Sequence, residues 1–220
     1  MGVIKRWLSY LFDFRFEVLA IILTWILFGG NLISGTFFHD ILFPVSVLIL
    51  IGVSIVMVKN KRKRVRYVFI TLAILMFFNV LGANLTEWRS SMKMIALIIP
   101  LVFFVLLSIE VFRQMVREKA VTRSIIIAAF DCYLLLGILG ATLFTILLHF
   151  NPDAYSNVDD TIRMFDKMLY FSFVTLTSIG YGDITPVTPL AEKVTAFFGL
   201  IGHFYSVVVV GVIVGKYVAK

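Results

Sequence analysis

A short polar segment, "TLTSIGYGD" (residues 175–183), interrupts a chain that is otherwise strongly apolar. It supplies hydroxyl groups and one carboxylate, and its glycines at positions 180 and 182 allow left-handed backbone angles that turn successive carbonyl oxygens toward one axis. A ring of such oxygens can replace the hydration shell of a cation. The segment therefore predicts a cation site built from backbone. The sequence carries no metal-ligand cluster or nucleophile–base constellation, so we expect no enzymatic activity.

The composition places this segment in a membrane protein. Of the 220 residues, 60% are hydrophobic and 15% are charged, and the mean hydropathy is +1.00, outside the range of soluble globular domains. Six apolar stretches approach the roughly 20 residues that a helix needs to cross the hydrocarbon core. We expect an all-α membrane protein with six transmembrane helices per subunit. The stretches are 17–37, 41–58, 67–84, 94–112, 124–149 and 190–218.

Lysine and arginine fix the orientation, because they concentrate on the cytoplasmic side. With the N-terminus inside, fifteen of the twenty basic residues are cytoplasmic and five are external, namely Arg89, Lys93, Arg163, Lys167 and Lys193. We therefore expect a multi-pass protein of the cell membrane with both termini cytoplasmic. The net charge of +7 then belongs to the inner face, so no nucleic-acid partner is expected. The basic run from Lys59 to Arg66 is favoured as a topology signal over an anionic-lipid site.

Residues 1–16 form a separate segment before the first stretch. Their apolar residues recur at helical spacing among basic ones, which predicts an amphipathic helix lying in the membrane interface. The alternative is an extension of the first span.

The region between the fifth and sixth stretches does not look like an ordinary loop. Residues 164–177 are apolar but too short to cross a membrane, and the polar segment follows at once. This profile predicts a re-entrant pore helix over 163–177 and a filter over 178–182. Non-helical backbone at membrane depth is tolerated only where protein buries it or where it lines a watery path. One chain offers one strand of carbonyls, so a closed ring requires several copies, and a homotetramer is the natural solution.

Over residues 124–218 the chain resembles the pore module of tetrameric potassium channels, because GYGD follows Thr-x-Thr-Ser between two spans. The resemblance is weak over residues 1–123. It implies passive potassium-selective conduction with K⁺ ions in the filter and no other cofactor. The implied filter residues are Thr177, Ser178, Ile179, Gly180, Tyr181 and Gly182, with K⁺ at Ser178, Ile179, Gly180 and Tyr181. The family usually has threonine at position 178, and serine lacks the methyl group that fixes its rotamer, so a looser innermost site is expected.

The resemblance also implies a group of residues that packs behind the filter and supports it. Relatives often carry two tryptophans where this chain has Tyr170 and Phe171. We expect Tyr170 to hydrogen-bond Asp183 behind the filter and Phe171 to pack. Val174 occupies a position that is acidic in some members of the family.

The last stretch, 190–218, is expected to be the inner helix. Gly202 lies at the separation from GYGD where relatives have a hinge glycine, and a hinge is favoured over packing; Gly211 lies where many voltage-gated relatives have a Pro-x-Pro bend. His203 and Ser206 fall on the predicted cavity face. A charged His203 would oppose potassium entry, while a neutral one would hydrogen-bond a neighbouring helix. An apolar constriction is expected from Val210, Val214 and Val218.

The four earlier stretches (17–112) occupy the position of a voltage sensor but lack its charges. The fourth, 94–112, contains no basic residue, so little or no intrinsic voltage dependence is expected. A cytoplasmic linker (113–123) should lead into a pore domain (124–220). Asp131, inside the fifth stretch, is expected to pair with Lys216 or Arg123.

Two other functions stay open. A weakly selective Na⁺/K⁺ channel is the nearest, since Ser178 leaves room for it. A transporter or a non-conducting channel subunit is less favoured, because neither inverted repeats nor paired broken helices are evident.

Overall fold

The computed structural model describes residues 12, 14–32, 42–57, 63–85, 90–118, 122–158 and 164–218. Most of the predicted interfacial helix and residues 59–62 of the basic run lie outside these ranges. Within them the chain is helical apart from turns, short loops and one isolated bridge between Tyr155 and Pro186. The elements are α2 (Arg15–Leu32), α3 (Phe43–Met57), α4 (Lys63–Leu85), α5 (Ser90–Arg117), α6 (Arg123–Phe150), the 3-10 turn η2 (Pro152–Ala154), α7 (Met164–Leu176) and α8 (Pro189–Val218).

Three helices in the described ranges are long and apolar enough to cross a membrane, over residues 97–117, 123–150 and 189–216. Shorter apolar helical stretches cover Val45–Met57 and Val65–Phe78. Helix α5 continues through Arg117, five residues into the predicted linker, since neither glycine nor proline follows Pro100 within it to end the helix. The break between α5 and α6 is correspondingly shorter than the sequence predicted.

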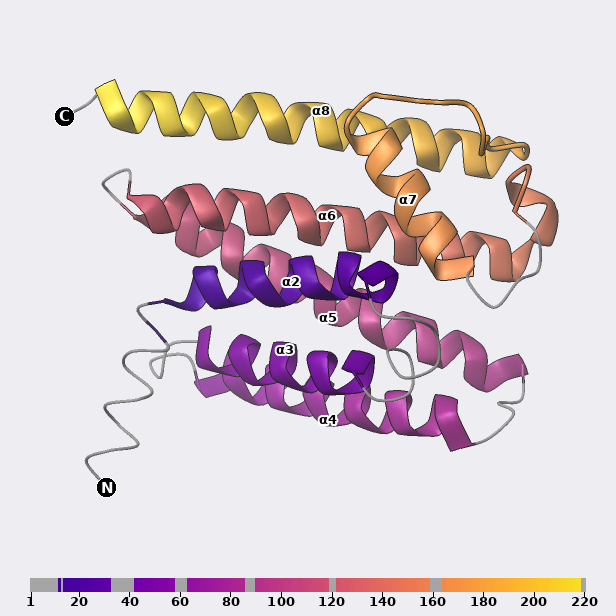
Figure 1. Ribbon diagram of the computed structural model, residues 1–220, viewed down its shortest axis with the longest axis horizontal. Coiled ribbons are helices and arrows are strands. Elements are labelled where there is room, and N and C mark those ends of the chain that lie inside the picture. Colours follow the sequence, from indigo (N-terminus) through magenta and orange to yellow (C-terminus); the bar gives the residue numbers. More distant parts are fainter. Residues whose placement is uncertain are drawn as a thin grey trace.

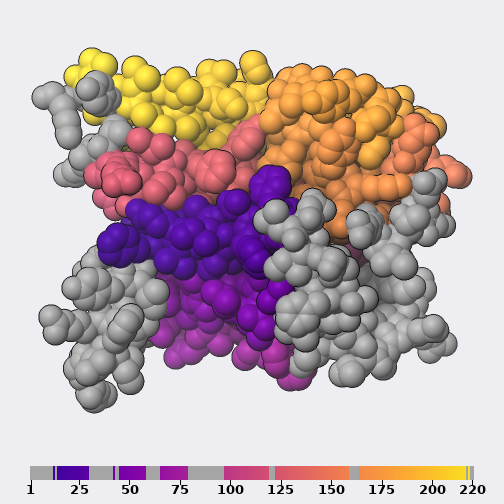
Figure 2. Space-filling model, in the orientation of Figure 1, coloured from indigo at the N-terminus to yellow at the C-terminus, as the bar shows by residue number. Residues whose placement is uncertain are grey.

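The long helices run side by side along the bundle, and the short helix α7 crosses them near one end (Figure 1). Helix α6 is central, because it packs on α2, α5, α7 and α8. Helix α8 lies along one edge, next to the segment around α7 (Figure 2). It packs on α6 and α7 but leaves a row of large apolar side chains exposed along its length.

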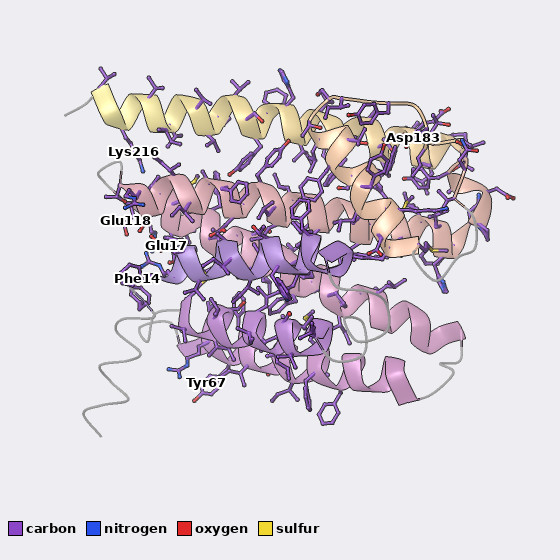
Figure 3. The ribbon with its side chains drawn as sticks, viewed as in Figure 1. Phe14, Glu17, Tyr67, Glu118, Asp183 and Lys216 are labelled. Atoms are coloured by element: carbon purple, nitrogen blue, oxygen red, sulfur yellow. The ribbon has the colours of Figure 1, made fainter. Side chains whose placement is uncertain are left out.

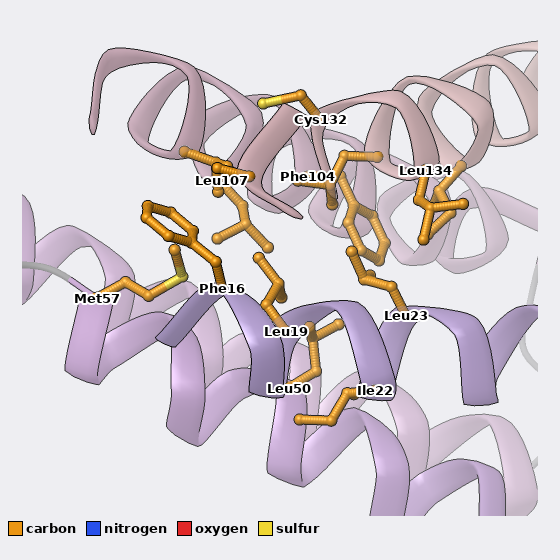
Figure 4. Packing of buried hydrophobic residues seen from close by; sticks show 14 of the residues in the cluster. Phe16, Leu19, Ile22, Leu23, Leu50, Met57, Phe104, Leu107, Cys132 and Leu134 are labelled. Carbon is orange, nitrogen blue, oxygen red and sulfur yellow. The ribbon is translucent and has the colours of Figure 1, made fainter. Parts of the chain in front are cut away.

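The main core packs α2 and α3 against α5 and α6. Phe16, Leu19 and Leu23 of α2 are almost fully buried and face Leu50 of α3 and Leu107 of α5 (Figure 4). These side chains interdigitate across three helices, so α2 forms the inner layer between α3 and the pair α5–α6. Apolar residues at helical spacing thus bury one face of each helix against its neighbours.

A second core, made of aromatic rings, fixes α7. The ring of Phe144 on α6 lies 5.2 Å from that of Phe171 on α7 and 5.4 Å from that of Phe198 on α8, measured between centroids. The ring of Tyr155, just after η2, lies tilted at 5.7 Å from that of Phe144 and edge-on at 5.3 Å from that of Phe171. Aromatic pairs at such separations add to the energy of burial. One cluster therefore joins α6, α7 and α8 behind the polar segment.

The two ends of the bundle carry different groups. Asp183 lies at one end, whereas Glu17, Glu118 and Lys216 lie at the other (Figure 3). The first turn of α2 and the last turn of α8 share this second end (Figure 1).

Candidate functional site

Two glycines of α6 allow α7 to pack closely against it. A β-carbon at Gly137 would overlap the ring of Phe173, and one at Gly140 would overlap the Phe198 ring and the Ser172 hydroxyl. The Ser172 hydroxyl donates a hydrogen bond of 2.8 Å to the Gly137 carbonyl, which leaves this buried serine satisfied. Helix α7 therefore rests directly on the backbone of α6. Sequence reasoning missed these glycines, although small residues four positions or fewer apart in a membrane helix often mark close packing.

The polar segment is tied to the last turn of α7 by its backbone. The amides of Ile179 and Gly180 both donate to the Val174 carbonyl, at 3.0 and 3.4 Å. The amide of Ser178 donates to the Thr175 carbonyl at 3.1 Å. The chain thus leaves α7 in a tight turn and starts its return against the carboxyl end of the helix, where the helix dipole is negative.

The backbone beyond this turn alternates in handedness. Ser178, Gly180 and Gly182 have φ of 57°, 58° and 78°, whereas Ile179 and Tyr181 between them are not in the positive-φ region. Such alternation rotates consecutive peptide planes so that their carbonyl oxygens can share one side of the strand. Glycine is needed at 180 and 182 because other residues are strained at these angles.

Ser178 adopts the left-handed conformation without being glycine. A non-glycine residue costs about 1–2 kcal/mol there, and a β-branched residue is a more severe outlier. The departure from threonine noted in the sequence therefore has a backbone consequence, because serine meets less steric opposition at this φ. Its hydroxyl is retained on an exposed side chain.

The whole segment Thr177–Asp183 is exposed in the single chain. Ile179 and Tyr181 are 52% and 69% exposed, which is unusual for large apolar side chains in an ordered loop. The Thr177 hydroxyl is already used, because it donates to the Phe173 carbonyl at 2.7 Å.

The outer part of the segment is clamped by the loop after α6. The Asn157 amide nitrogen donates to the Asp183 carbonyl at 2.8 Å. The Ser156 amide donates to the Thr185 carbonyl and the Val187 amide to the Ala154 carbonyl, at 2.8 and 2.9 Å. This short backbone pairing ties residues 183–187 to the loop that follows α6.

Tyr170 of α7 influences the charge of Asp183. A hydrogen bond from the Tyr170 hydroxyl is the largest influence on the Asp183 carboxyl and lowers its pKa, against a smaller opposing effect of desolvation. Phe171 is buried in the aromatic cluster. Val174 is buried too, and its carbonyl is the acceptor for the first amides of the return strand.

Helix α8 contacts the end of α7 at Gly202. A β-carbon there would lie 2.7 Å from the Leu176 carbonyl oxygen, so the backbones meet without an intervening side chain. Around Gly211 nothing lies within 4 Å of such a carbon. The residues assigned to the cavity and constriction are exposed in the single chain, namely His203, Ser206, Val210, Val214 and Val218.

Lys216 anchors the far end of α8. Its ammonium group donates to the carbonyls of Met115 and Val116, at 3.2 and 3.0 Å, and to that of Glu118. These are the carbonyls that the last turn of α5 leaves without a helical partner. Nearer the middle of α8, the Tyr205 hydroxyl donates to the Ala129 carbonyl of α6 at 2.6 Å.

The prediction that Asp131 pairs with Lys216 or Arg123 is therefore wrong. Asp131 is fully buried, and within the described residues neither of its carboxylate oxygens has a hydrogen-bond partner. Its charged neighbour is Glu17 of α2, another carboxylate, which accepts a hydrogen bond of 2.9 Å from the Ser124 hydroxyl. Lys216 binds the backbone at the end of α5 instead, because carbonyls at a helix end lack helical partners and accept hydrogen bonds.

Three long apolar helices, with a short helix and a glycine-containing loop between two of them, are consistent with a membrane channel. Residues 132–219 match the protein family described as "Ion channel". This match covers less than half of the chain.

The similar curated proteins are plant channels. Two-pore potassium channel 5 of Arabidopsis thaliana is 36% identical over 98 residues, which is 44% of this chain and 22% of that protein. Two-pore potassium channel 2 of the same plant is 36% identical over 88 residues, 40% of this chain and 18% of that protein. Two pore potassium channel c of Oryza sativa subsp. japonica is 50% identical over 46 residues, 20% and 10% of the two chains. No solved structure matches.

Proposed function

We propose that this chain forms a potassium-selective channel that conducts passively. The observation that carries the proposal is the alternating handedness at Ser178, Gly180 and Gly182 directly after the carboxyl end of α7. Carbonyl oxygens on one side of such a strand form the surface that a dehydrated cation requires. The similarity to potassium channels over residues 132–219 supports the choice of ion.

In this proposal α7 is a re-entrant pore helix and residues Thr177 to Gly182 are the selectivity filter. Six helices cross the membrane, with both termini cytoplasmic, as the charge distribution favours. K⁺ ions bind at the carbonyls of Ser178, Ile179, Gly180 and Tyr181, and the Ser178 hydroxyl adds a ligand at the innermost position. Tyr170, Phe171, Val174 and Asp183 support the filter from behind.

Four copies surround the pore. One chain supplies one strand of oxygens, and the large side chains of Ile179 and Tyr181 are uncovered in it. Neighbouring subunits would bury them and would place four equivalent strands around one axis. The exposed faces of α8 then line an inner cavity, with His203 and Ser206 above a constriction at Val210, Val214 and Val218.

The stimulus for opening is not membrane voltage in this account. The apolar part of α5 from Leu97 to Phe112 carries no arginine or lysine, so no positive side chain of this stretch moves through the field. Each charge that crosses the whole field contributes about 2.3 kcal/mol per 100 mV. Without such charges the open fraction changes little with voltage.

A weakly selective cation channel is the second candidate. The specific observation in its favour is Ser178, which lacks a β-branch that would fix its rotamer and sits in a left-handed conformation. An innermost site of this kind tolerates more than one ligand geometry.

Planar-bilayer recording from the full chain separates the two candidates. With K⁺ on one side and Na⁺ on the other, a potassium-selective pore gives a reversal potential displaced strongly toward the K⁺ equilibrium potential, and the weakly selective pore gives one near zero. Native mass spectrometry of the same preparation should yield four copies of the chain. A dimer, or conductance that rises steeply with voltage, would contradict the arrangement proposed here.

A further inference from the structure

Helix α7 crosses α6 at a point where a hydrogen bond and an aromatic contact lie next to each other (Figure 1). The Ser172 hydroxyl donates to the Gly137 carbonyl at 2.8 Å, and the Phe173 ring occupies the space beside Gly137. A β-carbon at Gly140 would lie 2.3 Å from Ser172 Oγ. Ser172 is fully buried, so its hydroxyl is kept from solvent and directed at the backbone of α6.

This hydrogen bond is directional, whereas the side chains around it are apolar. Met168, Phe171 and Val174 of α7 are buried, and the energy of such burial depends on area and has no preferred direction. Apolar contact therefore resists separation of the two helices more strongly than a small rotation of α7. A hydrogen bond weakens steeply as its angle departs from linearity. The bond from Ser172 to Gly137 thus defines the rotation of α7 on α6.

The start of the polar segment depends on that rotation. Val174 follows Ser172 by two residues, and its carbonyl accepts from the amides of Ile179 and Gly180 at 3.0 and 3.4 Å. The bond from Gly180 is longer than the usual range for an amide donor. A small rotation of α7 would therefore break the bond from Gly180 before the bond from Ile179.

We propose that Ser172 is a positioning residue for ion selectivity, because its hydrogen bond to Gly137 keeps the Val174 carbonyl aimed at the amides of the filter. This inference rests on the proposed function and adds to it a residue that contacts no ion. Selectivity depends on the number and arrangement of the coordinating carbonyls. A filter whose inner end is free to shift with α7 would accept a wider range of ions.

Hydrogen exchange of the full chain, purified in detergent with K⁺, tests the positioning step without requiring conduction. Ser172→Ala removes the hydroxyl and little else. The amides of Ile179 and Gly180 should then exchange about three- to tenfold faster, which is the equilibrium effect of one hydrogen bond. The Gly180 amide should change more, and the amides in the first two turns of α7 should keep their wild-type rates.

The consequence for selectivity is measured on the same protein. Calorimetric titrations with K⁺ and, separately, with Na⁺ give the ratio of the two affinities, and reversal potentials in bilayers give the permeability ratio. Both ratios of K⁺ over Na⁺ should fall about three- to tenfold in Ser172→Ala. Ser172→Cys retains a weaker donor and should give intermediate ratios.

Thr142→Val is the matched control. Thr142 is also buried, but its hydroxyl donates at 2.8 Å to the Ile138 carbonyl within α6 itself. The unfolding midpoint should fall by a similar amount in Thr142→Val and Ser172→Ala, whereas exchange at the filter and the ion ratios should change in Ser172→Ala alone. Native mass spectrometry should give the same number of subunits for both variants and the wild type.

The outcomes separate this inference from the function on which it rests. Preference of the wild type for K⁺, with unchanged exchange and unchanged ion ratios in Ser172→Ala, would overturn the inference and leave the proposed function standing. Equal binding of K⁺ and Na⁺ by the wild type would instead overturn the proposed function. A fall in the ion ratios that Thr142→Val reproduces would show that lost stability is the cause, and it would also overturn the role of Ser172.

Discussion

Gly202 of helix α8 lies directly against Leu176, the last residue of the short helix α7. A β-carbon on Gly202 would stand 2.7 Å from the Leu176 carbonyl oxygen and 2.9 Å from its α-carbon. Backbone atoms cannot retreat as a flexible side chain can, so this contact fixes the distance between α8 and the last turn of α7. Glycine at this position has a packing function whether or not the helix also bends there.

Gly202→Ala should therefore destabilise the folded protein, by about 1–3 kcal/mol for an overpacked contact. The measurement is the thermal unfolding midpoint of the purified protein. Gly211→Ala is the matched control on the same helix, since nothing lies within 4 Å of the added carbon. It should be neutral or stabilising by up to about 1 kcal/mol. Equal effects of the two substitutions would contradict the packing argument.

The pair Tyr170 and Asp183 makes a prediction about external pH. The hydrogen bond from Tyr170 holds the pKa of Asp183 below its usual value, so the carboxylate keeps its charge further into acid. Its stabilising interaction is present above the ordinary carboxyl pKa and is lost as pH falls through the lowered one. Tyr170→Phe removes the donor and should move this loss to higher pH.

Single-channel conductance as a function of external pH tests this shift. The expected result is a midpoint of acid inhibition at higher pH in Tyr170→Phe than in the wild type. Tyr155→Phe is the control, because the Tyr155 hydroxyl faces Thr195 at 3.3 Å and is not a partner of Asp183. A midpoint that stays in place in Tyr170→Phe would show that the hydroxyl does not set the charge at the mouth.

Asp131 is predicted to lower the stability of the protein. Its buried carboxylate has no hydrogen-bond partner within the described residues, and its nearest charged neighbour is Glu17. Such burial is unfavourable without compensation. Asp131→Asn should raise the free energy of unfolding by about 1 kcal/mol or more, and Asp166→Asn, on an exposed residue of α7, should change it by less than about 0.5 kcal/mol. A clear loss of stability in Asp131→Asn would reveal a cationic partner.

Ser178 is predicted to tune the innermost ion site. Ser178→Ala keeps the backbone carbonyl and removes the hydroxyl, so potassium should bind more weakly by about three- to tenfold, the cost of one lost ligand of roughly 1 kcal/mol. Calorimetric titration of the purified assembly with K⁺ measures this affinity. Unchanged affinity would exclude the hydroxyl as a ligand.

The sequence predicted features whose causes are local. The apolar lengths of α5, α6 and α8, the shortness of α7 and the need for glycine at 180 and 182 all follow from residues close together in the chain.

Contacts between helices that are far apart in the sequence could not be predicted from it. Nothing local shows that Gly137 and Gly140 form the floor under α7, or that Glu17 of α2 lies near Asp131 of α6. Lys216 illustrates the same limit, since its choice between a carboxylate and the carbonyls of α5 depends on where the end of α5 falls. These contacts join residues about 35 to 115 positions apart and are set by packing of the whole bundle.

Flux from purified protein in liposomes under opposed K⁺ and Na⁺ gradients decides whether this chain conducts potassium selectively. We expect K⁺ to move down its gradient while Na⁺ does not, and Gly180→Ala to abolish this selective flux, because alanine is strained at the φ of 58° that position 180 adopts. Equal movement of K⁺ and Na⁺ through the wild-type protein, or selective flux that survives Gly180→Ala unchanged, would contradict it.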